Sequence, residues 1–320
     1  MKQCIFFSIT LMLIVTLLAV GLYSYRLNAT QMAGDSLWNR FWLSRRQGFY
    51  ESKLVHAGKR LQLCENITQR SQYVATSMIT AENTDESDYL CWYVIAAQKL
   101  AYSLRSFLQM DMVLMIFDSK RRITQAQRDS LEQSGWQLCD IPAIDAPVST
   151  GSVNRYHKEK LFSKLWVWMF VEYDAVMYTD ADMIALASPA PIFTDTIPLM
   201  RSSNTGLSMS GFNAGFLVLL PSSSVFQHML VAMHNASCDT TFAEQDFLNW
   251  YWKDTKANLV WGYNTNADAK TYVHISAQLS SPIRIIFLHF IHKPWYDGVR
   301  DWDAESIRNF WLRVPPHAGC

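Results

Sequence analysis

Short apolar runs alternate along the chain with segments whose apolar residues recur at helical spacing. Short apolar runs are typical of buried strands, whereas an apolar residue at every third or fourth position is typical of a helix packed on a core. The strand-like runs are 73–79, 112–117, 136–141, 175–178, 216–220 and 283–287, and the helical segments are 89–107, 124–133, 157–173 and 222–233. This alternation predicts an α/β domain whose parallel sheet is covered by helices on both faces.

An apolar segment precedes this pattern at the N-terminus. Residues 5–22 contain no charged side chain, and their number is enough to cross a bilayer. A retained signal-anchor and a cleaved signal peptide both fit this composition, because Ala19-Val20-Gly21 loosely matches a cleavage site. The length of the run favours the anchor, with residues 1–25 forming a cytoplasmic tip and a transmembrane helix.

The rest of the chain divides into two segments that differ in their pattern of apolar residues. Residues 26–70 show no sustained strand pattern and suit a stem, whereas 71–320 read as one folded domain. Three Asn-x-Ser/Thr triplets, at Asn28, Asn66 and Asn235, favour a lumenal location for everything after the anchor in a eukaryotic cell. We therefore expect a single-pass type II protein of the Golgi or endoplasmic reticulum membrane.

Composition and charge narrow the function classes. Hydrophobic residues make up 50% of the 320 residues, which is enough to build a large core. Lys plus Arg and Asp plus Glu both number 28, so the formal net charge is +0 and no nucleic-acid partner is expected. The six cysteines show no C-x-x-C spacing, which disfavours a zinc or redox site and leaves one or two disulfides open, with no pairing deducible.

Two carboxylates follow the strand predicted at 175–178. Residues two apart project to the same side of an extended chain, so Asp180 and Asp182 can present both carboxylates to one hard cation. Ligand sites of open α/β sheets lie beyond the carboxyl ends of the strands, which is where this pair stands. Asp301-Trp302-Asp303 has the same spacing without a preceding strand, and we interpret it as a surface turn.

Four motifs in a fixed order make this chain resemble glycosyltransferase family 8, the glycogenin-like group. The first motif is Lys164-Leu165-Trp166-x-Trp168 followed by Tyr178-Thr179-Asp180-Ala181-Asp182, and the other three are Phe212-Asn213-Ala214-Gly215, Glu244-Gln245-Asp246 and His289-Phe290-Ile291-His292-Lys293-Pro294-Trp295. The resemblance as a whole spans about residues 72–296. The resemblance implies that residues 71–320 form a single GT-A-type nucleotide-sugar-binding catalytic domain, an α/β fold with a mixed, mainly parallel sheet and helices on both faces. It also implies a retaining transfer from a UDP-sugar to a glycan, glycoprotein or glycolipid acceptor.

The resemblance further implies a role for each matching residue. Asp180, Asp182 and His289 are expected to ligate Mn²⁺ or another divalent cation, a ligand set that suits a borderline ion. The expected catalytic residues are Asp180, Asp182, Gln245 and Lys293, with Lys293 on the donor diphosphate. The expected donor-binding residues are Thr76, Ser77, Tyr89, Lys164, Ala181, Asn213, Gly215, Glu244 and Lys293. Gln245 can only hydrogen-bond and no nucleophile is identifiable, so a front-face substitution is the most economical mechanism.

Departures from the family pattern keep other functions open. Glu244 stands where the family has Asp, while Asp246 and His292 stand where it has Gly, so the identity of the donor sugar is not deducible. One alternative is a non-catalytic sugar-binding or nucleotide-binding protein that keeps the fold. Another is a different metal-dependent nucleotidyl or phosphoryl transferase, although no Gly-rich phosphate loop supports it. Retention of all three expected metal ligands favours the enzyme.

Overall fold

The computed structural model describes residues 64, 67–81, 87–146, 158–193, 200–202, 211–234, 236, 243–254, 257–258, 261–266, 286–290 and 293. The chain divides into two units, Met1–Arg60 and Leu61–Cys320, and every described residue belongs to the second. The predicted anchor at 1–25 and most of the predicted stem therefore lie outside the described residues. Within the described part, no helix is long and apolar enough to cross a membrane.

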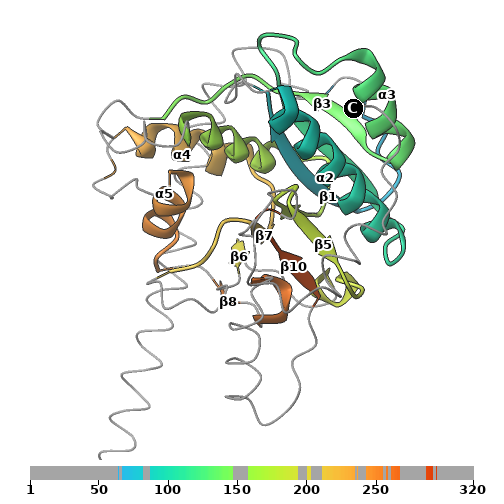
Figure 1. Ribbon diagram of the computed structural model, residues 1–320. Helices are drawn as coiled ribbons and strands as arrows, with labels where there is room; N and C mark the ends of the chain where they lie inside the picture. Colours follow the sequence, from blue (N-terminus) through green and yellow to red (C-terminus); the bar gives the residue numbers. More distant parts are fainter. Residues whose placement is uncertain are drawn as a thin grey trace, which may run out of the picture. The chain divides into compact units, whose positions relative to one another are not determined.

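A seven-stranded sheet in the order β3-β2-β1-β4-β7-β6-β8 forms the centre of this unit (Figure 1). Strands β3, β2, β1 and β4 are parallel, β7 is antiparallel to β4 and β6, and β8 is parallel to β6. The strands are β1 (Tyr73–Thr80), β2 (Asp111–Phe117), β3 (Gln137–Asp140), β4 (Ala175–Thr179), β6 (Met200–Ser202), β7 (Phe216–Leu219) and β8 (Ala257–Asn258). The predicted mixed, mainly parallel sheet is confirmed.

A second, three-stranded sheet has the order β5-β10-β9. Its strands are β5 (Met183–Ala185), β9 (Thr265–Asn266) and β10 (Phe287–His289). β10 runs antiparallel to β5 with His289 opposite Met183, and parallel to β9 with His289 opposite Asn266. This small sheet thereby brings His289 next to the end of the Asp-x-Asp segment. The strand predicted at 283–287 extends to His289, and residues 283–285 lie outside the described part.

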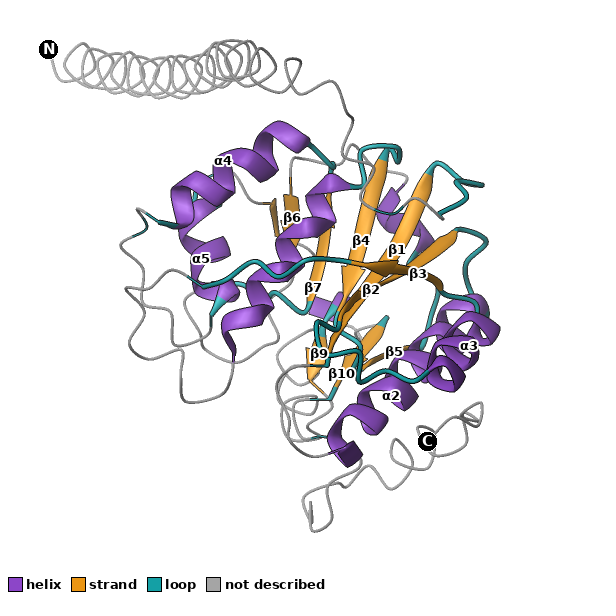
Figure 2. Cartoon of the chain, turned by 90° about the horizontal axis from the view of Figure 1, so that it is seen from above, coloured by secondary structure: helices purple, strands orange, loops and turns teal. Residues whose placement is uncertain are grey.

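Helices cover both faces of the large sheet, as the alternating pattern predicts (Figure 2). Helices α2 and α3 lie on one side, and α4 and α5 lie on the other with the 3-10 helix η2. Their bounds are α2 (Ser87–Arg105), α3 (Gln125–Ser134), η2 (Lys158–Met169), α4 (Ser223–Met233) and α5 (Glu244–Tyr251), with the shorter 3-10 turns η3 (Ala190–Phe193) and η4 (Trp261–Tyr263). Thr124 caps α3 with a capping box that includes Gln127, which explains the start of this predicted helix. Helix α5 is not predicted by the apolar pattern.

The strand side chains alternate between two cores. On β1, Val74 and Met78 pack in the cluster on the η2, α4 and α5 face, whereas Ala75 and Ile79 pack in the cluster under α2 and α3. Because both faces are covered, the parallel strands read as continuous apolar runs. This burial accounts for the clarity of the strand signal in the sequence.

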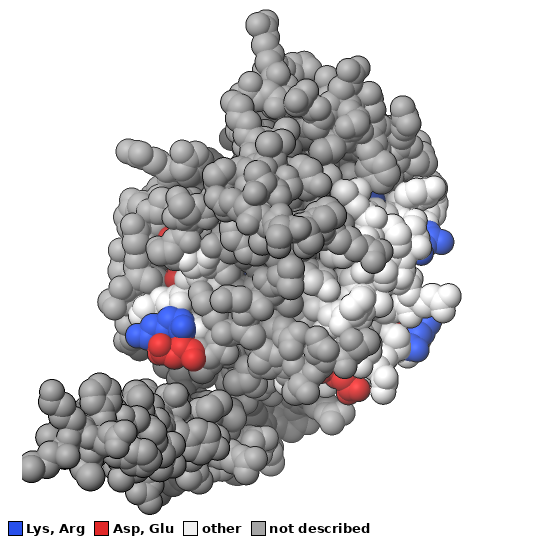
Figure 3. Space-filling view, turned by 90° about the horizontal axis from the view of Figure 1, so that it is seen from below, with Lys and Arg blue, Asp and Glu red and all other residues white. Residues whose placement is uncertain are grey.

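A disulfide and a buried carboxylate hold the segment that precedes β1 against the sheet. A disulfide joins Cys64, ahead of β1, to Cys139 on β3. The carboxylate of Asp111 accepts hydrogen bonds from the backbone N–H of Arg70 (2.7 Å) and Ser71 (3.2 Å) and from the Tyr173 hydroxyl (3.1 Å). On the surface shown in Figure 3, by contrast, the charged side chains of the described residues are scattered among uncharged ones.

Candidate active site

The two carboxylates of the Asp-x-Asp segment are held in a turn between β4 and β5. Sequence reasoning assumed an extended chain for this pair, whereas the structure bends the backbone after Asp180. The N–H of Asp180 donates to the carbonyl of Gly215 (2.8 Å), and the N–H of Phe290 donates to the carbonyl of Asp182 (3.0 Å). Backbone bonds to two segments distant in sequence thus fix both carboxylates at the carboxyl end of β4.

The structure brings Asp180, Asp182 and His289 together. One ligand atom from each residue lies within 4.8 Å of the others. His289 Nε2 lies 3.5 Å from Asp182 Oδ1 and 4.0 Å from Asp180 Oδ2. The three residues expected to bind a metal therefore converge on one point, although they come from β10 and from the turn after β4.

The second oxygen of each carboxylate is already engaged by the protein. Asp180 Oδ1 accepts the hydroxyl hydrogen of Tyr178 (2.8 Å) and lies 3.1 Å from the Lys164 ammonium. Asp182 Oδ2 pairs with the ammonium of Lys293. Asp182 Oδ1 is buried and has no hydrogen-bond partner among the described residues, a costly arrangement unless a ligand satisfies it. Two carboxylates and an imidazole with open atoms facing one another fit a divalent cation.

Gly215 leaves the space at the centre of this site. A Cβ at this position would lie 2.9 Å from Asp180 Oδ2, 2.7 Å from His289 Cε1 and 2.7 Å from Asn213 Oδ1. Each of these separations is shorter than an ordinary van der Waals contact, so a side chain would occupy the place where the ligand atoms converge. The glycine expected at the donor site thus has a steric reason that involves the metal ligands.

A buried ion-pair network lies beside the carboxylates. The Lys164 ammonium contacts Glu244 Oε1 (2.6 Å), Asp180 Oδ1 (3.1 Å) and the carbonyl of Ala214 (3.2 Å). Burial opposes the charge on Lys164, but the charges of Asp180 and Glu244 outweigh it and raise the lysine pKa. Burial also raises the pKa of Glu244 and, together with the charge of Asp180, that of Tyr178. Lys164 is therefore a fixed cation between two acids.

The charge of Asp182 is stabilised in a similar way. Burial by itself would raise its pKa, yet Lys293 and His289 outweigh burial and hold the pKa below its ordinary value. Lys293 also donates to the carbonyl of Phe290 (3.0 Å), which keeps the ammonium beside the carboxylate turn. Asp182 is thus held as a carboxylate, the form that binds a cation.

A chain of side-chain amides leads away from His289. His289 Nδ1 lies 3.1 Å from Asn264 Oδ1, and Asn264 Nδ2 donates to Asn213 Oδ1 (2.9 Å). Asn213 Nδ2 in turn donates to Gln245 Oε1 (3.0 Å). Ala243, with φ +53° and ψ −123°, precedes Gln245 at the start of α5, and this strained backbone helps to aim α5 at the site. Asn264 and Tyr178 were missed as site residues, because neither falls on a spacing that suggests a ligand.

Three of the residues expected to bind the donor, Thr76, Ser77 and Ala181, are buried. Thr76 and Ser77 are fully buried in the middle of β1, where the Thr76 hydroxyl donates to the carbonyl of Met177 (3.3 Å), rather than at the ligand edge of the sheet. The carboxyl end of β1 lies three or more residues later, at Thr80. Ala181 is buried in the turn between the two aspartates.

The side chains of the remaining residues that were singled out in the sequence lie outside the described part. Tyr89 lies in the first turn of α2, but its side chain is outside the described part. His292, Trp295 and the Asp301-Trp302-Asp303 segment are also outside it. The donor contact expected of Tyr89 and the surface turn expected at Asp301-Trp302-Asp303 stay predictions.

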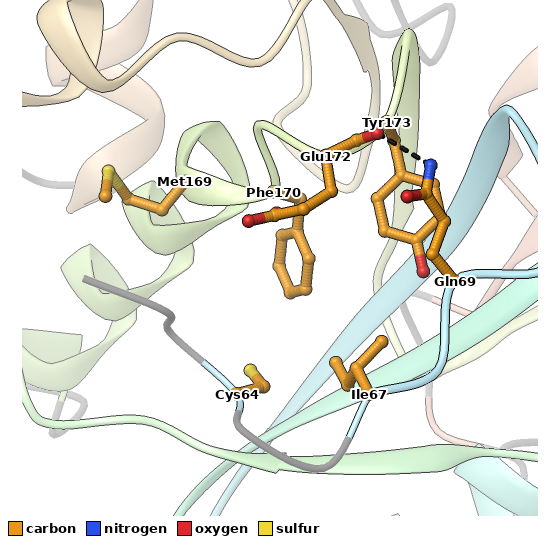
Figure 4. Close-up of a pocket in the computed structure, with 7 residues that line it drawn as sticks. All are labelled: Cys64, Ile67, Gln69, Met169, Phe170, Glu172 and Tyr173. Carbon is orange, nitrogen blue, oxygen red and sulfur yellow. Dashed lines mark hydrogen bonds between the residues drawn. The ribbon is translucent and has the colours of Figure 1, made fainter. Parts of the chain in front are cut away.

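A separate pocket lies near the amino end of β4 (Figure 4). The side-chain amide of Gln69 donates to the carbonyl of Glu172 (2.7 Å) at this pocket. It is lined by Cys64, Ile67, Gln69, Met169, Phe170, Glu172 and Tyr173. Tyr173 precedes β4 whereas Asp180 follows it, so the pocket is separate from the carboxylates. Ligands of open α/β sheets bind at the carboxyl ends of the strands, which favours the Asp180 end as the active site.

No protein-family model matches the chain. Among curated proteins, it is similar to UDP-glucuronate:xylan alpha-glucuronosyltransferase 2 of Arabidopsis thaliana, with 27% identity over 234 residues that cover 71% of this chain and 36% of that protein. Glycogenin of Neurospora crassa is 30% identical over 181 residues, which cover 54% of this chain and 26% of glycogenin. Galactinol synthase 1 of Solanum lycopersicum is 30% identical over 125 residues, covering 32% of this chain and 39% of the synthase. The chain spans less than two fifths of the length of each of these relatives.

Two solved structures share the fold. The glycosyltransferase GlyE of Streptococcus pneumoniae has a TM-score of 0.52 and 19% identity, covering 76% of this chain and 60% of GlyE. The galactosyltransferase LgtC, in complex with donor and acceptor sugar analogues, has a TM-score of 0.53 and 15% identity, covering 75% of this chain and 94% of LgtC. At these identities the likeness concerns the fold alone, which is a GT-A-like α/β fold.

Proposed function

We propose that this chain transfers a sugar from a UDP-sugar with retention of configuration at the anomeric carbon, as its resemblance to glycosyltransferase family 8 implies, and its similarity to glycogenin and to UDP-glucuronate:xylan alpha-glucuronosyltransferase 2 supports this proposal. The observation that carries the proposal is the convergence of Asp180, Asp182 and His289 within 4.8 Å at the carboxyl end of β4. A nucleotide diphosphate brings two adjacent anionic groups to such a site, and a divalent cation held there can bind both the protein and the donor.

Asp180, Asp182 and His289 would hold the cation, which we take to be Mn²⁺. When bound, the ion would act as a Lewis acid toward the diphosphate oxygens and neutralise charge on the departing UDP. The protein itself orients the two carboxylates, since Tyr178 and Lys164 hold Asp180 and Lys293 holds Asp182. Such preorganisation reduces the reorganisation required during the reaction.

Lys293 and Lys164 would have different roles in the site. Lys293 is partly exposed at the edge of the carboxylate turn, so its ammonium can reach a phosphate oxygen while Asp182 anchors it. Lys164 is buried and is held between two acids, so it orders Asp180 and Glu244 rather than moving to the substrate. We accordingly assign Lys293 to the diphosphate and Lys164 to the support of the site.

Gln245 and Glu244 would face the sugar of the donor. In the retaining reaction, the bond from the anomeric carbon to the diphosphate oxygen breaks, the acceptor oxygen bonds to the same face of that carbon, and the acceptor hydroxyl proton passes to the departing diphosphate. Glu244 Oε2 is buried without a hydrogen-bond partner among the described residues, which suits a carboxylate that accepts hydrogen bonds from sugar hydroxyls. Asn213 and Gly215 line the same place.

We also propose the cellular setting expected from the sequence. The apolar run at 5–22 would anchor a type II protein in the Golgi or endoplasmic reticulum membrane, with 26–70 as stem and 71–320 as the lumenal catalytic domain. The acceptor would then be a glycan, a glycoprotein or a glycolipid. Glycosidase treatment of the protein from eukaryotic cells tests this setting, because a lumenal chain with used sequons would shift in electrophoretic mobility.

A panel of UDP-sugars tests the activity. The full chain is incubated with each UDP-sugar with and without Mn²⁺, and released UDP is measured. We expect metal-dependent release with at least one sugar, and loss of that release in Asp180→Asn and Asp182→Asn. Asp140→Asn, which changes an exposed carboxylate paired with Arg128, serves as the control. Binding of UDP with Mn²⁺ but without turnover would instead favour the non-catalytic binding protein.

A further inference from the structure

The backbone at Gly215 determines which way the side chain of Asn213 points. Gly215 N–H lies 2.9 Å from the side-chain atom of Asn213 that faces it. A backbone N–H can only donate, so that atom must be the Asn213 oxygen, Oδ1. The backbone N–H of Gly215 therefore determines which atom of this amide is the oxygen and which is the nitrogen.

This fixed amide determines the next one. The same Asn213 Oδ1 lies 2.9 Å from an amide atom of Asn264, which must then be the donor Nδ2. The oxygen of Asn264 consequently faces His289 Nδ1 at 3.1 Å. An amide oxygen only accepts, so Nδ1 carries the hydrogen, and in the neutral imidazole the lone pair then lies on Nε2. Nε2 is the atom that faces Asp180 and Asp182.

The amide of Gln245 is oriented by the same logic. Its Oε1 accepts from Asn213 Nδ2 (3.0 Å) and from the backbone N–H of Ala214 (3.1 Å). Two donors thus hold the oxygen, and Nε2 makes no hydrogen bond to any described residue. Gln245 therefore offers an N–H donor to whatever lies over the site, and its oxygen is not available to attack a substrate.

We propose that Asn264 is a positioning residue that sets His289 as an Nε2 ligand and, through Asn213, connects the metal ligand to Gln245. The inference rests on the proposed function, since it presumes that His289 binds a cation. Asn264 is fully buried between η4 and β9, and β9 pairs with β10 beside His289. Outer-shell partners of metal-bound histidines of this kind typically change metal affinity by about 10-fold to 100-fold when they are removed.

Two substitutions at Asn264 test its contact with His289 and its contact with Asn213 separately. Asn264→Ala removes both hydrogen bonds, so the imidazole loses its acceptor and Asn213 loses a donor. Asn264→Asp keeps an oxygen for His289 Nδ1–H, but it sets a second oxygen against Asn213 Oδ1. Gln98→Ala is the matched control, because it removes a buried amide that hydrogen-bonds Ser130 (2.8 Å) between α2 and α3.

The test is a titration of each full-chain protein with Mn²⁺ alone, followed by electron paramagnetic resonance of the free aqueous ion, with UDP release measured separately. We expect Asn264→Ala to raise the Mn²⁺ dissociation constant about 10-fold to 100-fold. We expect Asn264→Asp to keep wild-type Mn²⁺ affinity within a few-fold but to lose most UDP release. Gln98→Ala should change neither property.

The contrary outcomes are distinct. Unchanged Mn²⁺ affinity in Asn264→Ala, or an equal loss of affinity in Asn264→Asp, would overturn the positioning role while leaving the proposed function intact. Wild-type protein that binds no Mn²⁺ would overturn the metal site itself, and the inference with it. A folded Asn264→Ala protein is verified by circular dichroism before the comparison is made.

Discussion

Tyr178 donates its hydroxyl hydrogen to Asp180 Oδ1 across 2.8 Å, from a position two residues earlier on β4. The Lys164 ammonium lies 5.0 Å from the centre of the same phenol ring and 3.1 Å from Asp180 Oδ1, so the ring and the hydroxyl both lie beside the Asp180 carboxylate. Tyr178 is almost completely buried, and a phenylalanine would retain its packing. The hydroxyl therefore serves the orientation of Asp180 more than the stability of the sheet.

We predict that Tyr178→Phe raises the Mn²⁺ concentration needed for half-maximal UDP release by about 10-fold, the lower end of outer-shell effects. Asp180 Oδ1 would keep only Lys164, and the carboxylate could rotate away from His289. The measurement is a metal titration of donor hydrolysis. Tyr173→Phe makes the same chemical change ahead of β4 and should leave the titration unaltered. An unshifted titration in Tyr178→Phe would remove the hydroxyl from the metal site.

Tyr173 supports a separate prediction about pH. Burial, followed by the charge of Asp111, raises the pKa of Tyr173 above 10.0. The raised value means that the folded state retains a proton that the unfolded state releases near pH 10. The contribution of this group to stability is thus present below about pH 10 and is lost as pH rises further, with a slope of up to about 1.4 kcal/mol per pH unit.

We expect wild-type stability to fall more steeply above pH 10 than that of Tyr173→Phe. At neutral pH the variant should lose about 1 kcal/mol, the typical contribution of one hydrogen bond, because the N–H groups of Arg70 and Ser71 still satisfy Asp111. Urea unfolding followed at several pH values measures both quantities. Parallel curves for the two proteins up to the alkaline limit would contradict the assigned pKa shift.

The sequence predicts the strands that are buried on both faces of the sheet. β1, β2, β4 and β7 are apolar runs because helices cover both sides of the sheet. Helix α5 was missed because its sequence, Glu244–Tyr251, opens with three polar residues, of which Glu244 and Gln245 contact other residues of the site. Short strands such as β9 carry no periodic signal, since they are defined only by pairing with β10.

The candidate site was accessible mainly through its ordered motifs. Asp180, Asp182 and His289 were expected together, and their ligand atoms converge in the structure. The physical cause is the pairing of β10 with β5, two strands that are far apart in the sequence. Asn264 could not be found in this way, because a single asparagine between two short elements resembles any loop residue. Hydrogen-bond direction is a tertiary property, and no spacing in the sequence encodes it.

Gly215 provides a steric prediction. An alanine Cβ would lie 2.9 Å from Asp180 Oδ2 and 2.7 Å from His289 Cε1, so the ligand atoms would have to separate. We expect Gly215→Ala to reduce UDP release by at least about 100-fold and to weaken Mn²⁺ binding, as a misplacement of about 1 Å does at other sites. Gly135→Ala is the control, because φ +111° at Gly135 makes that substitution destabilising at a place distant from the carboxylates. Full Mn²⁺ affinity in Gly215→Ala would contradict the steric role.

Lys164 provides the final prediction, which concerns stability and activity together. Its ammonium lies 2.6 Å from Glu244 Oε1 and 3.1 Å from Asp180 Oδ1, and the Lys164 side chain is only 4% exposed. Lys164→Met leaves two acids facing each other without a cation, and removal of one partner of a buried ion pair typically costs about 3–5 kcal/mol. Lys160→Met on the same helix, whose partner Asp145 is 75% exposed, should cost less than about 1 kcal/mol.

The double variant Lys164→Met/Glu244→Gln distinguishes the two contributions of the lysine. Replacing the Glu244 carboxylate with an amide removes the repulsion, so we expect the double variant to recover most of the stability that Lys164→Met loses. It should not recover UDP release, because Asp180 still lacks its buried cation and the donor sugar has lost the Glu244 carboxylate. Urea midpoints and UDP release, measured on all four members of the cycle, decide the question. A double variant no more stable than Lys164→Met would mean that Lys164 stabilises the fold through its packing rather than through its charge.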